Sequence, residues 1–309
     1  MPRESRRVVF MDIVDGVKMN GQLDSEGQGE TGVSLSARFL GPFQVYVEGR
    51  AIGPLDWDRR NGGNRMVATI FAYLVAHRKG TVPRSDLLDT FWRNRDGDTA
   101  ASGLNRSISA LRRVLEPALQ NFGSSSYIFS SRGFIGIDPD LTVWVDAEEF
   151  EETAQRGLSL ESQGERTGAA TAYQEALRLY RGEYMEGVPY AKVWCEGHRA
   201  YLRQLHTTVL LQLMRLAEAE ANPILAIECC RKVLAKERCS EEACRTLIGL
   251  LLGMGRRGEA LTVLESCGAV LKKKHGLDPC KATTELYSRI MAPPEGPIRR
   301  WGRRHSSGG

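Results

Sequence analysis

The chain has 309 residues, 42% of them hydrophobic, and a formal net charge of +4. This length is enough for two domains that each bury a core. No run approaches the roughly 20 apolar residues that a membrane-spanning helix needs, so we expect no membrane segment and a cytoplasmic location. All seven cysteines lie at or beyond Cys195, which argues against a disulfide framework.

The charge is unevenly distributed along the chain. Residues 34–137 hold 14 Lys and Arg against 8 Asp and Glu, whereas residues 138–292 hold 20 against 23. This local surplus predicts that the first half contacts an anionic partner. Residues 1–33 and 292–309 lack a sustained apolar period, and we expect a disordered N-terminal extension and a disordered basic tail there.

In the first half of the chain, after residue 33, the spacing of apolar residues changes several times. Residues 35–52 predict the short strands of a small antiparallel sheet. Apolar spacing predicts one helix over 65–77, a second from about Pro83 to Trp92 with its proline in the first turn, and a third over 99–117. Residues 127–137 predict a β-hairpin with a basic tip. Sheet, three helices and hairpin is the order of a winged helix-turn-helix domain.

The predicted third helix has two faces with different chemistry. At 100° per residue, an apolar stripe is formed by Leu104, Ile108, Leu111 and Leu115. The opposite side carries Ser102, Arg106, Ser109 and Arg113. Guanidinium groups separated by short hydroxyl residues suit a DNA groove. An ordinary amphipathic surface helix has the same pattern, so the neighbouring elements must decide between the two interpretations.

If this helix enters the major groove, its outer side chains are the candidate contacts. We expect Arg106 and Arg113 to bind guanine edges or phosphates. Ser102, Asn105 and Ser109 are expected to permit close approach or to read bases.

Further candidates flank the helix. Arg112 lies toward the packed side, and we expect it to contact the flanking DNA backbone. Arg84, at the start of the second helix, is expected to hold the backbone of the opposite strand. At the hairpin tip, Arg132 with Ser130 and Ser131 is expected to reach a phosphate or the adjacent minor groove.

From about residue 145 to 291 the chain is predicted to be wholly helical. A pattern of buried-type residues recurs with offsets of 4 and 7, at Ala169, Tyr173 and Ala176, at Ala226, Cys230 and Val233, and at Ala260, Leu264 and Cys267. The second and third sets are 34 residues apart, which is the period of tetratricopeptide repeats.

Several segments resemble a known family. FLGPFQVYVEGRAI, VPRSDLLDTFW and AASGLNRSISALRRVLEP resemble the OmpR-type winged helix of the Streptomyces antibiotic regulatory protein (SARP) family, although Asn61-Gly62-Gly63-Asn64-Arg65 stands where that family carries a basic pair. GAATAYQEALRLYRGEY and GRRGEAL resemble the bacterial transcriptional activator domain that follows in the same family. The resemblance implies an α+β winged-helix domain at 34–140 and an all-α tetratricopeptide-like domain at 145–291.

The same resemblance implies a function. It predicts a sequence-specific DNA-binding transcriptional regulator, most often an activator, that binds direct repeats in double-stranded promoter DNA and engages RNA polymerase. The helical domain would then serve as the surface for homodimerisation. An alternative is a protein-interaction adaptor of the tetratricopeptide type, in which the winged helix is only a scaffold.

Sequence motifs for cofactor binding, catalysis or metal binding are weak. Residues 253–258 match G-x-G-x-x-G, but they follow a predicted helix, and we expect a helix-to-helix turn with no cofactor. The sequence has no Walker loop, H-E-x-x-H or G-x-S-x-G, so we expect no enzyme and no catalytic residue. Cys195 and His198 are expected to pack rather than bind a metal. The acidic run at 148–152 is expected to be the solvated face of a helix start.

Overall fold

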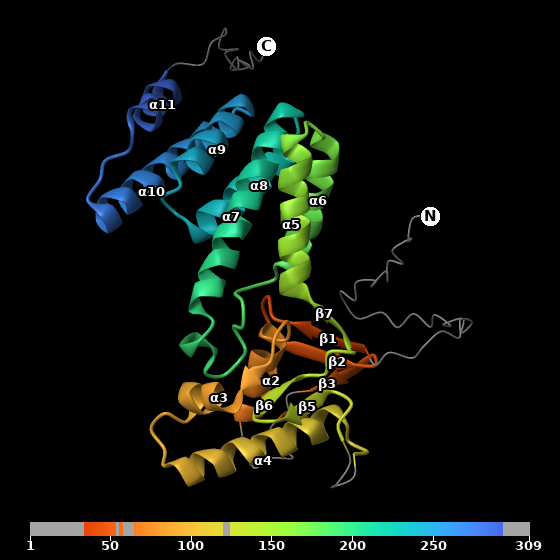
Figure 1. Cartoon of the computed structure of the whole chain (residues 1–309). Helices are drawn as coiled ribbons and strands as arrows, with labels where there is room; N and C mark the ends of the chain where they lie inside the picture. The colour runs from red at the N-terminus through yellow and green to blue at the C-terminus, as the bar shows by residue number, and fades with distance from the viewer. Residues whose placement is uncertain (1–33, 54–55, 58–64, 120–123, 293–309) are drawn as a thin grey trace, which may run out of the picture. The chain divides into compact units, whose positions relative to one another are not determined.

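The computed structural model describes residues 34–53, 56–57, 65–119 and 124–292. The predicted disordered segments, 1–33 and 292–309, lie outside the described residues except for Ala292. All described residues belong to one compact unit, Val33–Gly309. Figure 1 shows its two parts, a mixed α/β part built up to β7 and a helical part after it.

The first sheet has four strands in the order β3-β2-β1-β7. They are β1 (Ser34–Arg38), β2 (Gln44–Val47), β3 (Arg50–Ile52) and β7 (Thr142–Val145). The first three are antiparallel, as predicted, but β7 runs parallel to β1 with Leu35 opposite Val143. The sequence did not predict β7, because its partner β1 lies more than 100 residues earlier in the chain.

Three helices follow the first strands. They are α2 (Met66–Ala76), α3 (Arg84–Phe91) and α4 (Gly97–Leu115). The predicted order is confirmed, with one difference at α3. Pro83 is not in the first turn of α3, because it caps the helix in an extended conformation as part of β4 (Val82–Pro83). Helix α2 is central, since its residues 67–72 are all buried.

The predicted hairpin is confirmed as the wing. Strands β5 (Ile128–Ser131) and β6 (Phe134–Ile137) are antiparallel, and β4 pairs with the other edge of β6. The two residues between the strands, Arg132 and Gly133, have φ values of 49° and 84°. Two consecutive positive φ angles define the tight turn whose twist matches that of the paired strands.

The helical part consists of consecutive helix pairs. Its helices are α5 (Asp146–Ser162), α6 (Arg166–Leu179), α7 (Glu196–Ala219), α8 (Pro223–Lys236), α9 (Glu241–Gly253), α10 (Arg257–His275) and α11 (Lys281–Met291), with a short turn η2 (Ala191–Val193) before α7. Figure 1 shows α5 packed beside α6, α7 beside α8 and α9 beside α10. All nine residues of the repeated pattern are buried in α6, α8 and α10, which confirms the tetratricopeptide-like arrangement.

A buried carboxylate joins the two parts. Asp146, the first residue of α5, accepts hydrogen bonds from the backbone N–H groups of Phe39 (2.6 Å) and Leu40 (3.1 Å). Burial raises the pKa of Asp146, although these two N–H groups and Arg181 oppose the shift. Leu40 also forms a β-bridge with Tyr184. The end of β1 is therefore held by groups from the helical part.

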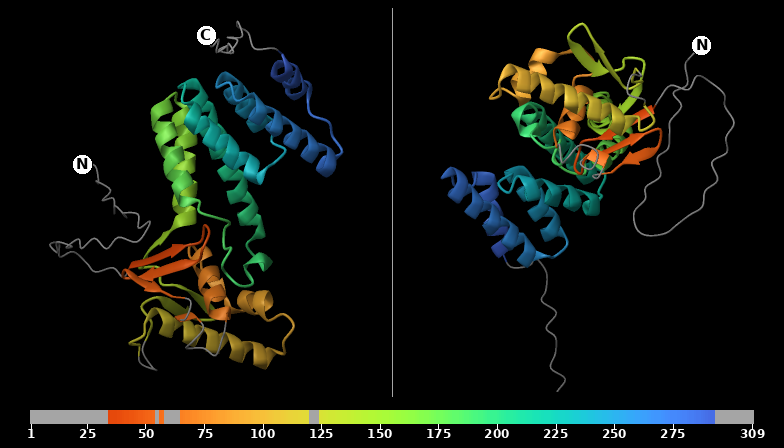
Figure 2. Two further views of the ribbon diagram at one scale, coloured as in Figure 1. Left: turned by 180° about the vertical axis from the view of Figure 1, so that it is seen from behind. Right: turned by 90° about the horizontal axis from the view of Figure 1, so that it is seen from below.

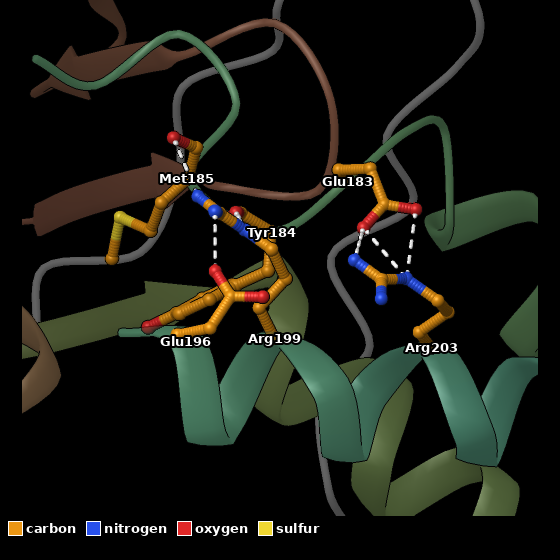
Figure 3. A network of polar contacts seen from close by, with 6 residues as sticks. All are labelled: Glu183, Tyr184, Met185, Glu196, Arg199 and Arg203. Atoms are coloured by element: carbon orange, nitrogen blue, oxygen red, sulfur yellow. Dashed lines mark hydrogen bonds and ion pairs between the residues drawn. The ribbon is translucent and has the colours of Figure 1, made fainter. Parts of the chain in front are cut away.

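Arg199 on α7 secures the same segment from the other side, as Figure 3 shows. Its Nε donates to the carbonyl oxygen of Tyr184 at 2.7 Å, and its Nη1 lies 3.1 Å from Glu196. Arg203, one turn further along α7, pairs with Glu183 at 2.8 Å but is half exposed. Arg199 is buried, so it is the arginine that supports the bridge between Tyr184 and Leu40.

The acidic run at the start of α5 differs from its predicted role. Glu148 is not simply solvated, because its carboxylate forms a bidentate pair with the guanidinium of Arg78 after α2. Burial alone would raise the pKa of Glu148, but the hydrogen bonds and charge of Arg78 outweigh it and the pKa is lowered. The pair adds a second link between the two parts.

Residues 253–258 span the turn from one helix to the next, as expected. Helix α9 ends at Gly253, Gly255 has a φ of 74° and α10 begins at Arg257. In the part of the chain that the structure describes, no three His, Cys, Asp or Glu side chains are placed to hold a metal ion. Across the same residues, no helix has both the length and the apolar character needed to cross a bilayer.

Candidate nucleic-acid interface

Helix α4 begins and ends at recognisable signals. The carboxylate of Asp96 accepts a 2.9 Å hydrogen bond from the backbone N–H of Thr99, and this bond lowers the pKa of Asp96. The cap starts α4 at Gly97, two residues before the predicted start. The helix ends at Leu115, because Pro117 disfavours a helical conformation for the residue before it.

The two predicted faces of α4 are confirmed by burial. Leu104, Ile108, Leu111 and Leu115 are all at most 5% exposed. The opposite face is exposed, and we call it the reading face: Ser102, Asn105, Arg106, Ser109 and Arg113. Seen from below in Figure 2, α4 lies across the front of the mixed α/β part. No described residue covers this row of polar side chains, so a partner can reach it.

The two arginines of the reading face are held differently. Arg113 Nε lies 3.3 Å from the carbonyl oxygen of Ser109, one turn earlier in α4. Arg106 is exposed and forms no ion pair with any residue that the structure describes. A guanidinium without a protein partner keeps all five N–H donors for an anionic or acceptor-rich ligand.

Arg84 connects α3, α4 and the wing. Its Nη2 donates to Oδ1 of Asn105 at 2.6 Å, and its backbone N–H donates to the carbonyl oxygen of Gly133 at 2.9 Å. The structure thus brings together two candidates from different predicted helices, Arg84 and Asn105, and ties Arg84 to the wing through Gly133. Arg84 was predicted to hold a DNA backbone directly, whereas here its guanidinium orients the amide of Asn105.

The wing presents its predicted residues to the outside. Ser130, Ser131 and Arg132 are all exposed. Arg132 occupies the first turn position, so its guanidinium is carried at the extreme end of the hairpin. The backbone bond from Arg84 to Gly133 places this tip next to the start of α3.

Arg112 lies toward the packed side of α4, as predicted, and its guanidinium contacts the wing. It is half-buried, and its Nη2 lies 3.4 Å from the carbonyl oxygen of Ile128 at the start of β5. Its Nε is buried and has no hydrogen-bond partner among the described residues. Arg112 therefore packs between α4 and the wing and is not on the reading face, because β5 covers the side of the helix toward which it points.

Two residues that position α4 could not be found from the sequence. Arg50 in β3 donates from Nη2 to the carbonyl oxygens of Val114 (3.3 Å) and Leu115 (3.4 Å), at the negative end of the helix dipole. Gly103 lies against Trp92, and a Cβ there would be 2.8 Å from the indole nitrogen. Both contacts join segments that are not neighbours along the chain, so no local sequence pattern predicts them.

Other candidates from the sequence lie elsewhere. Cys195 is buried, and His198 Nε2 lies 3.2 Å from Glu151, so the pair makes packing and polar contacts within the protein as expected. Lys272, Lys273 and Lys274 occupy the last turn of α10, where cations offset the helix dipole.

Comparison with known proteins agrees with this architecture. The family described as "Bacterial transcriptional activator domain" matches residues 145–291. Regulatory protein AfsR of Streptomyces coelicolor is 26% identical over 256 residues, which cover 82% of this chain and 24% of AfsR. Transcriptional regulator RedD of the same species is 24% identical over 256 residues, covering 81% of this chain and 72% of RedD. The chain thus spans about a quarter of the length of AfsR.

A solved structure shows the same fold. Mycobacterium tuberculosis EmbR, in complex with a low affinity phosphopeptide, superposes with a TM-score of 0.64 at 19% sequence identity, covering 84% of this chain and 65% of EmbR. The likeness extends over the winged helix and the tetratricopeptide-like helices together. Residues 145–291 thus match the bacterial transcriptional activator domain, and the chain as a whole is similar to transcriptional regulators of the SARP type.

Proposed function

We propose that this transcriptional regulator binds promoter DNA in a sequence-specific manner through α4 and the wing. The observation that carries the proposal is the reading face, an exposed row of arginine, asparagine and serine on a helix whose other face is buried. A helix of this kind fits the major groove, which is wide enough to admit it.

Individual roles follow from the contacts of each side chain. Arg106 and Arg113 bind guanine edges or phosphates, and Ser102 and Ser109 let the helix approach closely. Asn105, which Arg84 already orients, presents its amide to a base, since an amide pairs in a bidentate way with adenine.

The wing supplies the second contact. Arg132 at its tip binds a phosphate or enters the minor groove, with Ser130 and Ser131 beside it. Because Arg84 N–H holds the tip through Gly133, the wing and α4 engage one duplex as a preformed pair. Less ordering is then needed on binding, which favours affinity.

The proposal also includes two protein partners, a second copy of the chain and RNA polymerase. The protein acts as an activator in the bacterial cytoplasm, two copies bind direct promoter repeats side by side, and the helical part contacts the second copy and RNA polymerase. Tandem winged helices on one face of DNA give direct repeats, whereas a two-fold dimer gives a palindrome.

A selection experiment tests sequence-specific binding. The full chain is incubated with a random library of DNA duplexes, and the bound fraction is amplified and sequenced over several rounds. We expect one motif to be enriched, in direct repeats, and the variant Arg106→Ala/Arg113→Ala to enrich nothing. The control Arg178→Ala/Arg289→Ala removes the same charge from exposed positions on α6 and α11 and should enrich the same motif. No enrichment by the unmodified chain would favour the adaptor interpretation.

A further inference from the structure

A cavity of about 380 Å³ lies where the winged-helix part meets the helical part. Its walls come from the end of α2, from the start of α5, and from residues 184–198, which include η2 and the start of α7. None of the proposed DNA contacts lines it. A volume of this size accommodates a small organic molecule.

One wall of the cavity is aromatic. Trp194 lies edge-on to Tyr73 with ring centres 5.0 Å apart, and its ring is 5.9 Å from that of His77. Tyr184 lies edge-on to His198 at 4.9 Å. His77 is fixed further by its Nδ1, which donates to the carbonyl oxygen of Tyr73 at 2.8 Å. These contacts hold the rings in place, so the wall is preformed.

The other wall carries carboxylates. Glu148, Glu151 and Glu152 line the cavity with one lysine, Lys79. Glu148 is already paired with Arg78 and lies 3.5 Å from Lys79. The nearest partner of Glu151 is the imidazole of His198, whose Nε2 lies 3.2 Å from Oε1 of Glu151.

Glu152 is exposed and forms no ion pair within the described part of the chain. None of the described lysines and arginines forms an ion pair with Glu151 or Glu152, and both carboxylates line the cavity. Burial raises the pKa of Tyr184, which lines the same cavity, and the charges of Glu151 and Glu148 raise it further.

We propose that this cavity binds a small organic ammonium ion. The cationic nitrogen is held by Glu151 and Glu152 through charge-assisted hydrogen bonds, and the apolar body packs against Trp194 and Tyr184. Both features are needed, because an anion is repelled by the carboxylates and a purely polar cation leaves the aromatic wall unfilled. The walls come from both parts of the molecule, so an occupant stabilises their contact.

Calorimetric titration of the full chain with three probes tests the proposal. Phenethylamine has a primary ammonium and an aromatic body, phenylacetate has a similar body with the opposite charge, and spermidine has charge without an aromatic body. We expect phenethylamine to bind saturably, with one-to-one stoichiometry, and to raise the melting temperature of the protein. Binding of phenylacetate or spermidine as tight as that of phenethylamine would overturn the proposal, and so would the absence of saturable phenethylamine binding.

Single substitutions locate the site. Glu151→Gln and Glu152→Gln each remove one charge, and we expect each to weaken phenethylamine binding about tenfold. Glu152 is exposed, so its substitution is tolerated by the fold. Glu265→Gln, at an exposed position on α10, is the matched control and should bind as the unmodified chain does. Equal affinity of all three variants would place the ligand elsewhere and refute the assignment.

Discussion

Arg106 and Arg112 lie six residues apart on the same helix, and their surroundings differ completely. Arg106 is exposed on the reading face, whereas Arg112 is wedged against Ile128 with a buried Nε that no described residue satisfies. Periodicity correctly placed Arg106 opposite the apolar stripe. It could not show that the strand β5 covers Arg112, because that depends on where the wing returns to α4.

The substitution Arg112→Met tests whether Arg112 packs within the protein or contacts DNA. Methionine retains the unbranched stem but removes the buried charge, and such replacements are often neutral or stabilising. We expect the free energy of unfolding, measured in urea, to change by less than about 1 kcal/mol and DNA affinity to change by less than about threefold. The matched substitution Arg106→Met should weaken DNA binding about tenfold or more. Equal losses of affinity in both variants would place Arg112 on the DNA.

His206 on α7 is a buried base in the helical part. It is 6% exposed, its ring centre lies 4.0 Å from that of Tyr180 with the planes tilted by 30°, and Lys236 lies over the Tyr180 ring. Burial, assisted by the charges of Lys236 and Lys232, lowers the pKa of His206 to about 3. The imidazole of His206 therefore stays neutral in the folded protein at pH values where it binds a proton in the unfolded protein.

This difference predicts a loss of stability in acid. Above pH 6.5 both states are neutral at this position, and below it only the unfolded state gains a proton, until the pH approaches 3. Between pH 7.5 and pH 5 the contribution of His206 to the free energy of unfolding should fall by about 2 kcal/mol. His206→Phe keeps an aromatic ring beside Tyr180, and in urea unfolding at the two pH values it should lack this part of the loss. Identical losses in the two proteins would show that His206 is accessible to protons.

At the scale of elements, local signals predicted most of what the structure contains. Helix spacing, capping residues and the turn between β5 and β6 each act within a few residues, so α2, α3, α4 and the wing were predictable. The parallel strand β7 was not, because its partner β1 lies more than 100 residues earlier. The hydrogen bonds from Arg50 to the end of α4 were missed for the same reason.

The wing turn offers a test of one local signal. Gly133 has a φ of 84°, and a Cβ built on it meets nothing within 4 Å. Gly133→Ala should therefore lower the free energy of unfolding by about 1 kcal/mol through backbone strain alone. Gly80 has equally open surroundings without a φ in the left-handed region, and Gly80→Ala should not destabilise the protein in this way. Thermal denaturation in which both variants lose the same amount would contradict the assigned turn.

At the scale of the whole described unit, the DNA-binding and helical parts are joined by buried polar contacts. Asp146 holds the backbone of Phe39 and Leu40, and Arg199 holds the backbone of Tyr184, which pairs with Leu40. The sequence predicted two domains in the right order but none of these links. We therefore expect the two parts to unfold in one cooperative transition.

Arg199 and Arg203 provide a matched pair for testing that link. Arg199→Met leaves the buried carbonyl oxygen of Tyr184 without its donor, and we expect a loss of about 3 kcal/mol in the free energy of unfolding. Arg203→Met breaks only a half-exposed ion pair with Glu183 and should cost less than about 1 kcal/mol. Urea unfolding followed by far-UV circular dichroism and by tryptophan fluorescence measures both. A larger loss for Arg203→Met, or separate transitions in the unmodified chain, would contradict the link.

The central claim is that the reading face of α4 binds DNA, and the salt dependence of affinity tests it most directly. Affinity of the full chain for its selected duplex is measured by fluorescence anisotropy over a range of salt concentrations. For Arg106→Ala/Arg113→Ala we expect weaker binding and a slope of log affinity against log salt that is shallower by about 2, because two phosphate or base contacts are lost. Arg178→Ala/Arg289→Ala should keep the slope of the unmodified chain. Coincident slopes and affinities for all three proteins would contradict the claim.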